Sequence, residues 1–248
     1  LNDNPGKYDI SSLTAIISSG VIWSPEVKQG LLEHNSKMVL TDAFGASEAA
    51  GFGRSVTTAD GTTERAKFVL GDNCKVFSES FEEIEPGSQE SGYIAKSGAI
   101  PLGYYKDEEK TAGTFPTING IRYSMPGDIC RIAADGSLIL LGRGNACINT
   151  GGEKVYPEEV EGVLKTHPGI VDALVVGMPD EKWGQSVNAV VEPETGVSVE
   201  ESALRDHVRK HLAGYKVPKR IFADSKIARH NNGKPDYERA AEYVRSQL

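Results

Sequence analysis

The sequence lacks several features that would point to particular classes of protein. No apolar run approaches the roughly 18 residues that cross a bilayer, and no signal peptide is recognisable, so we expect neither a transmembrane segment nor secretion. An excess of positive charge is also lacking, since 27 Lys and Arg stand against 35 Asp and Glu, a net charge of -8. Such a chain repels nucleic-acid phosphates, which argues against an open nucleic-acid-binding surface.

Cysteine is scarce as well. The chain has three cysteines, Cys74, Cys130 and Cys147, an odd number without the spacing of metal ligands. This predicts a reducing compartment, and we expect a cytoplasmic protein. Internal repeats and low-complexity segments are also missing, so the 248 residues read as an ordinary globular chain of one large or two smaller domains.

The first 60 residues have the pattern of an α/β segment. Residues 13–19 and 38–41 are apolar runs suited to strands, and Ser24-Pro25-Glu26 is a typical helix start. We expect that helix to turn Val27, Leu31 and Leu32 toward the core. A strand-helix-strand order predicts parallel pairing, with residues 42–48 forming a turn at a strand's carboxyl end, where ligands bind in open α/β sheets.

From about residue 61 to residue 142 the pattern changes to short alternating segments separated by turns. It predicts antiparallel strands, with a short helical insertion at residues 101–112. The predicted strands are Lys67–Leu70, Lys75–Phe77, Tyr93–Ala95, Asp128–Ala133 and Leu138–Leu141. We interpret this region as the remnant of a small β-barrel within a larger domain.

The last hundred residues predict a compact α+β domain in the order α-β-β-α-β-α. Its first helix should begin at Pro157, its second at a capping box of Ser198 and Glu201, and its third at Pro235. The predicted organisation is therefore a large domain at residues 1–142, comprising an α/β segment at 1–60 and an antiparallel β subdomain at 61–142, and a small mobile domain at residues 143–248.

Several polar residues and glycines are candidates for a site, although each has an ordinary structural interpretation too. Glu48 fits a metal ligand or a surface acid, and Asp128 a turn residue or an acceptor for ribose hydroxyls. Arg143 fits a surface ion pair or a fork for phosphate or ribose, and Lys234 a solvated lysine or a charge delivered to an anion. The pair Gly151-Gly152 fits a plain turn or a close approach of backbone to ligand.

The order and spacing of these residues resemble the adenylate-forming superfamily, which includes acyl- and aryl-CoA synthetases, adenylation domains of peptide synthetases and luciferase. The resemblance covers nearly the whole chain. It is most specific at residues 151–161, which look like fatty-acyl-CoA ligases, and at residues 233–237, which are similar to actinobacterial ligases of fatty acids and steroid side chains.

This resemblance implies roles for individual residues. Glu48 would bind Mg²⁺, Lys234 would position the carboxylate and the α-phosphate, and Asn145 would lie at the hinge between the domains. Residues implied in ATP or AMP binding are Gly20, Ala43, Phe44, Gly45, Ser47, Asp128 and Arg143, and those implied in CoA binding are Gly151, Gly152 and Glu153.

The implied reaction joins a fatty-acid-like or steroid side-chain carboxylate to ATP, releases pyrophosphate, and passes the acyl group from the adenylate to CoA. Attack of a carboxylate on Mg-ATP brings two anions together, so Mg²⁺ and a lysine would offset the repulsion. The two steps need different groups at one site, which rotation of the small domain about Arg143–Asn145 would supply in turn.

One family feature is not found in the sequence, namely a Ser/Thr/Gly-rich phosphate loop ending in Pro-Lys upstream of Glu48. Together with the start at Leu1, this predicts that the chain is the carboxyl-terminal part of a longer enzyme and would not adenylate an acid alone. Two alternatives stay open, an adenylation protein that loads a carrier protein and a non-catalytic nucleotide-binding module.

The sequence contains little information on the acyl substrate. Val21, Ile22 and Trp23 fit an apolar wall of a substrate tunnel, but core packing accounts for them about as well.

Overall fold

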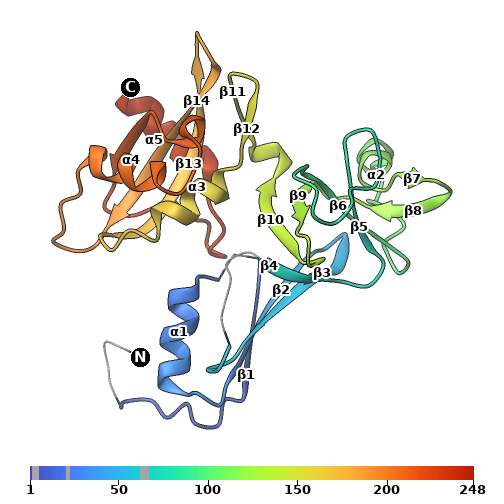
Figure 1. Ribbon diagram of the computed structural model, residues 1–248, viewed down its shortest axis with the longest axis horizontal. Coiled ribbons are helices and arrows are strands. Elements are labelled where there is room, and N and C mark those ends of the chain that lie inside the picture. Colours follow the sequence, from blue (N-terminus) through green and yellow to red (C-terminus); the bar gives the residue numbers. More distant parts are fainter. Residues whose placement is uncertain (2–5, 21–22, 62–66) are drawn as a thin grey trace. The chain divides into compact units, whose positions relative to one another are not determined.

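The computed structural model describes residues 1, 6–20, 23–61 and 67–248, and the chain divides into two compact units, Leu1–Leu140 and Leu141–Leu248. The division falls within strand β10 (Leu138–Arg143) (Figure 1). Each unit has its own buried clusters of apolar side chains. Each therefore has the packing that an independent core requires.

The first unit opens with the predicted strand-helix-strand motif, β1 (Ala15–Ser19), α1 (Pro25–His34) and β2 (Val39–Ala46). β1 and β2 pair in parallel, as predicted. Ser24 caps the helix, its Oγ accepting a hydrogen bond from the Val27 amide at 3.3 Å. Val21 and Ile22 lie outside the described residues, whereas Trp23 packs against the cluster of Leu32, Met38 and Leu40, which favours core packing for that side chain.

The predicted buried face of α1 was wrong in one respect. Val27 is 54% exposed, while Lys28 is almost wholly buried beside Leu32. The reason is an ion pair between Lys28 and Asp42 of β2, whose side chains are 2% and 11% exposed. A lysine can be buried where a carboxylate pairs with its charge. The ion pair, and not the spacing of apolar residues, therefore determines which side of α1 is buried here.

The predicted turn at residues 42–48 was also wrong. β2 continues to Ala46, and only Ser47 and Glu48 form the turn that leads to β3 (Ala49–Thr57). Gly45 lies at an irregularity in the pairing, where a Cβ atom would stand 2.9 Å from the Gly51 backbone nitrogen. This glycine therefore permits a close approach of two strands instead of ending one.

The antiparallel strands join the same sheet as the α/β segment, because β3 pairs with β4 (Lys67–Leu70). The order of the strands is β1-β2-β3-β4-β10-β9-β6-β8-β7, with β5 beside β6, a mixed sheet with no closed barrel among the described strands. The remaining elements of this unit are β5 (Cys74–Phe77), β6 (Gly92–Ser97), α2 (Glu108–Thr114), β7 (Thr117–Ile118), β8 (Ile121–Ser124) and β9 (Asp128–Ile132).

The second unit has the predicted order α-β-β-α-β-α, preceded by a small hairpin. Its centre is a long hairpin of β13 (Ile170–Asp180) and β14 (Gly184–Pro193). The other elements are the 3-10 turn Gly144–Ala146, β11 (Ile148–Thr150), β12 (Glu153–Val155), α3 (Pro157–Leu164), α4 (Glu201–Arg209), the 3-10 turn Gly214–Lys216, β15 (Arg220–Ala223) and α5 (Tyr237–Gln247).

Both faces of the β13–β14 hairpin are covered. Alternate residues of β13 point to opposite faces, so Ala173 and Val175 pack with α3 and α4, whereas Leu174 and Val176 pack with α5. Figure 1 shows the hairpin (yellow-orange) among these helices (yellow, orange and red). This burial explains why β13 and β14 read as apolar runs in the sequence.

Two predicted helix starts in this unit were wrong. α4 begins at Glu201, with Glu200 as its N-cap residue. The Glu201 carboxylate accepts a hydrogen bond from the Ile221 amide at 3.1 Å, so this side chain connects the helix to β15 instead of forming the predicted capping box. α5 begins at Tyr237 with Asp236 as its N-cap, whereas Pro235 forms a bridge with Arg229 just before the helix.

Candidate functional site

The strand ends of the first unit bring most of the predicted nucleotide-binding residues together. The parallel register sets Ser19 of β1 against Ala43 of β2, so Gly20 follows β1 beside Phe44 and Gly45. Gly20 has φ of +87°, which favours glycine where the chain leaves the strand. Ser47, Glu48 and the strand end are therefore part of one local region, at the carboxyl end of two parallel strands.

Phe44 is held by aromatic neighbours. Its ring centroid lies 5.3 Å from that of Phe52 and 5.4 Å from that of Phe68, and the side chain is half-buried against the core of the first unit. These distances are typical of favourable aromatic pairs. The ring of Phe44 is thus fixed in orientation, which a stacking surface for a base requires.

Glu48 contacts a residue that the sequence reasoning missed. The Tyr104 hydroxyl donates a hydrogen bond to Glu48 Oε1 at 2.6 Å. Tyr104 itself is held by the Thr111 hydroxyl, which accepts a hydrogen bond from the Tyr104 amide at 2.8 Å and donates one to the Asp107 carbonyl at 2.6 Å. Partial burial, together with the hydrogen bond to Glu48, raises the pKa of Tyr104 above its ordinary value, so the phenol keeps its proton and remains a donor to higher pH than an exposed tyrosine does.

Mg²⁺ that is bound together with ATP commonly takes one or two protein carboxylates, because phosphate oxygens and waters supply its other ligands. No group of three His, Cys, Asp or Glu side chains suited to a metal ion occurs within residues 6–20, 23–61 and 67–248. A dedicated all-protein metal cage is therefore not built from these residues. The signal that could have identified Tyr104 is its place after Gly103, just ahead of the predicted helical insertion.

Asp128 is buried at the first position of β9, directly after Gly127, which has φ of +99°. Burial, reinforced by the charge of Asp128, raises the pKa of the Cys130 thiol two residues along the strand. A buried carboxylate at the start of a strand, directly after a tight turn, suits an acceptor for ribose hydroxyls.

Arg143 belongs to the second unit and is exposed at the end of β10. The preceding Gly142 has φ of +149°, and a Cβ atom there would collide with the Glu158 carboxylate of α3. Only glycine allows α3 to pack this close to the connection. Asn145 follows in the 3-10 turn Gly144–Ala146, and its side chain lies outside the described residues.

Gly151 and Gly152 form the two-residue turn of the β11–β12 hairpin, with φ of +60° and +87°. Two positive φ values are typical of the turn that joins tightly paired strands, and glycine meets that requirement best. The Gly151 amide donates a hydrogen bond to the Trp183 carbonyl at 2.9 Å, and a Cβ on Gly151 would lie 2.7 Å from the indole. The turn therefore rests on the tip of the β13–β14 hairpin (Figure 1), with Glu153 exposed beside it.

Lys234 lies at the end of a closed turn between β15 and α5. The His230 amide donates to the Lys234 carbonyl at 2.9 Å, and the Gly233 amide donates to the His230 carbonyl at 2.8 Å. The Lys234 amide donates to Asn232 Oδ1 at 3.1 Å. These three hydrogen bonds, all within residues 230–234, fix the backbone of the turn, while Lys234 itself is exposed.

The Lys234 turn and the Gly151 turn contact opposite ends of β13. Arg229, which bonds to the Gly233 carbonyl, contacts Asp172 near the start of the strand, whereas Gly151 contacts Trp183 just beyond Asp180 at its end. Positions 172 and 180 are eight residue steps apart, and a strand rises about 3.3 Å per step, so the two ends lie roughly 26 Å apart. The two turns therefore cannot reach one reacting atom in a single arrangement of this unit.

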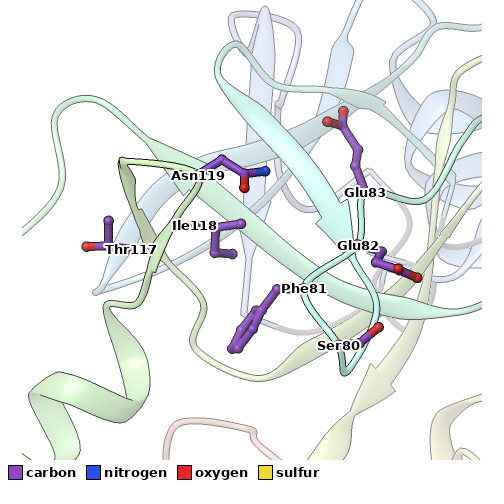
Figure 2. Close-up of a pocket in the computed structure, with 7 residues that line it drawn as sticks. All are labelled: Ser80, Phe81, Glu82, Glu83, Thr117, Ile118 and Asn119. Atoms are coloured by element: carbon purple, nitrogen blue, oxygen red, sulfur yellow. The ribbon is translucent and has the colours of Figure 1, made fainter.

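A surface depression of about 760 Å³ lies elsewhere in the first unit, and Figure 2 shows its lining, which comes from residues 80–83 and from residues 117–119 at β7 and just after it. Phe81 and Ile118 supply apolar surface, while Glu82 and Glu83 supply carboxylates. Glu83 pairs with Lys75 at 2.5 Å. None of the predicted site residues lines it, and its carboxylates would repel an anionic nucleotide, so it does not fit the predicted chemistry.

Comparison with known proteins agrees with the predicted class. The family model of the AMP-binding enzyme C-terminal domain matches residues 159–234, most of the second unit. The predicted resemblance to adenylate-forming enzymes is confirmed.

The chain is 46% identical over all 248 residues to the medium/long-chain-fatty-acid–CoA/3-oxocholest-4-en-26-oate–CoA ligase of Mycobacterium marinum, of which it covers 45%. It is 46% identical to the 3-oxocholest-4-en-26-oate–CoA ligase of Rhodococcus rhodochrous, with 95% of this chain and 43% of that protein covered. The chain thus spans about 45% of the length of these curated relatives.

Solved structures agree on the fold. The amide bond synthetase McbA from Marinactinospora thermotolerans superposes with a TM-score of 0.83 at 27% identity, over 95% of this chain and 47% of that one. ATP-bound MatB from Rhodopseudomonas palustris superposes with a TM-score of 0.79, over 93% of this chain and 45% of that one, at 24% identity, which bears on the fold alone. None of the described helices is long and apolar enough to cross a membrane.

Proposed function

We propose that the protein acts as an AMP-forming acyl-CoA ligase on a fatty acid or steroid side-chain carboxylate, with these 248 residues supplying part of the enzyme. The observation that carries this proposal is the 46% identity to a ligase of that specificity, which extends over every residue of the chain. The share of the relatives covered supports the expectation that a preceding region supplies the phosphate loop.

In the first half-reaction, a carboxylate oxygen of the acid attacks the α-phosphorus of ATP and pyrophosphate leaves with the electron pair of the broken bond. Glu48 would bind Mg²⁺ together with ATP phosphates, and Lys234 would place its ammonium between the two anions. This proposal is supported by the hydrogen bond that orients Glu48 and by the closed turn that presents Lys234.

The nucleotide would be held mainly by the first unit. Phe44, fixed by two aromatic neighbours, would stack on adenine, with Ala43, Gly45, Ser47 and Gly20 lining the pocket beside it. Asp128 would accept the ribose hydroxyls and Arg143 would contact the same sugar. Holding ATP in one orientation lowers the entropic part of the barrier.

In the second half-reaction, the CoA sulfur attacks the acyl carbon, AMP leaves, and the thiol proton is released to solvent. Gly151, Gly152 and Glu153 would contact the pantetheine arm. Because the two turns of the second unit lie roughly 26 Å apart on β13, the enzyme must rearrange between the two steps. We place the domain boundary at residues 142–143 and the rearrangement at Arg143–Asn145.

Two finer features belong to the same proposal. Strands β4 to β10 would form the part of a small barrel-like subdomain that supports the ribose-binding carboxylate. The three cysteines are free thiols, which supports a reducing compartment such as the cytoplasm.

The proposal is tested with the longer gene product that carries the phosphate loop. Fatty acids of increasing length and a steroid side-chain acid are offered with ATP, and free CoA, a phosphopantetheinyl carrier protein and a simple amine are compared as acceptors. Acyl-CoA and AMP as the main products support the proposal. Transfer to the carrier or the amine in preference to CoA would replace it with another adenylating function, and no adenylate with any acid would favour a non-catalytic module.

A further inference from the structure

One charged cluster of the second unit connects the Lys234 turn to the central hairpin. Arg229 donates from Nε to Asp172 Oδ2 at 2.7 Å and from Nη2 to Asp172 Oδ1 at 2.8 Å. A third bond runs from Arg229 Nη1 to the carbonyl of Gly233 at 2.9 Å. One guanidinium thus bridges the start of β13 and the residue immediately before Lys234.

The geometry of this contact depends on arginine. A guanidinium is planar and presents a rigid fork of donors, so it can satisfy both oxygens of a carboxylate and still donate a third bond at a fixed angle. A lysine ammonium is a compact charge on a flexible stem and cannot hold both partners in the same way.

Burial and charge strengthen the anchor. The Arg229 and Asp172 side chains are 26% and 16% exposed, so water screens the pair only partly. Burial raises the pKa of Asp172, but the hydrogen bonds from Arg229 and the charge of Lys165 outweigh it and leave the pKa below its ordinary value. Lys165 also contacts Asp172, at 3.4 Å, so the carboxylate has cations on two sides.

The backbone on both sides of the turn converges on Arg229. Arg229 forms a bridge with Pro235, and the Asp236 amide donates to the Ala228 carbonyl at 3.1 Å. The chain from His230 to Lys234 is otherwise closed by its own hydrogen bonds, with His230 Nδ1 also 3.8 Å from Asp236 Oδ2, and it carries exposed residues. The Arg229 fork is therefore a contact through which Asp172 of the central hairpin fixes the turn that presents Lys234.

We propose that Arg229, held by Asp172, is a positioning residue for Lys234 and serves the adenylation half-reaction selectively. This inference rests on the proposed function of Lys234. The Gly151 turn lies at the other end of β13, so loosening the Lys234 turn leaves the thioester half-reaction intact. A displacement of about 1 Å at a catalytic group can cost about 100-fold in rate, which sets the expected size of the effect.

The first arm of the test needs no activity and uses the chain itself. Amide hydrogen exchange is measured at His230, Gly233 and Lys234 in the wild type, in Arg229→Lys and in Asp172→Asn. Both variants are expected to exchange faster at these amides while the amides of β14 keep their protection. The matched control is Arg209→Lys, since Arg209 pairs with Asp206 on the exposed face of α4. Unchanged exchange in Arg229→Lys would overturn the inference.

The second arm measures the two half-reactions separately in the longer enzyme. Arg229→Lys is expected to lower acyl-adenylate formation about 100-fold while thioester formation from preformed acyl-adenylate and CoA stays at the wild-type rate. A parallel fall in both half-reactions together with a lower Tm would assign Arg229 a merely structural role and overturn the inference. So would wild-type adenylation by Arg229→Lys.

Lys234→Ala separates this inference from the function on which it rests. If Lys234→Ala loses adenylation but Arg229→Lys keeps it, only the positioning role is refuted. If Lys234→Ala adenylates at the wild-type rate, the proposed role of Lys234 is refuted, and the positioning role falls with it whatever the exchange rates are.

Discussion

Replacing the buried acid Glu161 by a neutral residue should raise the free energy of unfolding of the second unit at neutral and alkaline pH. Its side chain is 3% exposed on α3, and Oε1 accepts a hydrogen bond from the Val175 amide of β13 at 3.0 Å. Burial, reinforced by the charge of Glu158, raises the pKa of Glu161 to about 7 against the opposing charge of Lys165. The charged form is therefore disfavoured in the folded state.

The sign and size of the effect follow from this pKa. Between the ordinary value of 4.5 and about 7, the folded state holds the proton more tightly than the unfolded state does. The contribution of Glu161 to the free energy of unfolding should therefore be largest at acid pH and fall as the pH rises through this window. The shift corresponds to roughly 3 kcal/mol when one pKa unit is taken as about 1.4 kcal/mol. Glu161→Gln, which keeps an acceptor for the Val175 amide, should abolish this fall.

The assay is urea unfolding followed by the fluorescence of Trp183 in a Trp23→Phe background, because Trp183 lies in the second unit and Trp23 in the first. The free energy of unfolding is compared at about pH 5 and about pH 8. Glu242→Gln on the exposed face of α5 is the matched control and should follow the pH dependence of the parent. The reasoning is refuted if Glu161→Gln keeps the same pH dependence as the parent.

Two further predictions concern the site. Tyr104→Phe removes the hydrogen bond to Glu48. The Mg²⁺ concentration needed for half-maximal adenylation should rise about 10-fold, because loss of an outer contact to a metal ligand typically weakens metal binding by that much. An unchanged Mg²⁺ titration would contradict this prediction. Gly151→Ala adds a Cβ 2.7 Å from the Trp183 ring, whereas a Cβ added by Gly152→Ala meets nothing within 4 Å. Gly151→Ala should therefore have the lower Tm and the slower thioester step of the two variants. Equal effects of the two variants would argue against the close contact.

The sequence was sufficient for elements with strong local signals. Ser24-Pro25 predicted the start of α1, and the runs around Leu174 and Val190 predicted the two central strands of the second unit. These elements follow from capping chemistry and apolar patterning, which act over a few residues. The order α-β-β-α-β-α was predictable for the same reason.

Contacts between distant residues were not predictable in this way. Lys28 is buried because Asp42 of a neighbouring strand neutralises it, and Glu201 ties α4 to β15 instead of capping its own helix. Gly45 looked like a turn but marks a close approach of two strands. In each case the partner comes from another element, so the local pattern lacks the deciding information.

The same limit applies to the candidate site. The resemblance named Glu48 and Lys234 from their motifs, but not Tyr104 and Arg229, which contact Glu48 and the Lys234 turn. Tyrosine and arginine are common on protein surfaces, and neither Tyr104 nor Arg229 belongs to a recognisable sequence motif. Their contacts became visible only when the fold brought residues 48 and 104, or 172 and 229, together.

The measurement that tests the central claim most directly is pyrophosphate exchange into ATP, driven by a fatty acid, in the longer protein with and without Lys234→Ala. Thioester formation from synthetic acyl-adenylate and CoA is measured in parallel. The account predicts that Lys234→Ala abolishes acid-dependent exchange and leaves thioester formation unchanged. Exchange by Lys234→Ala at the wild-type rate would contradict it.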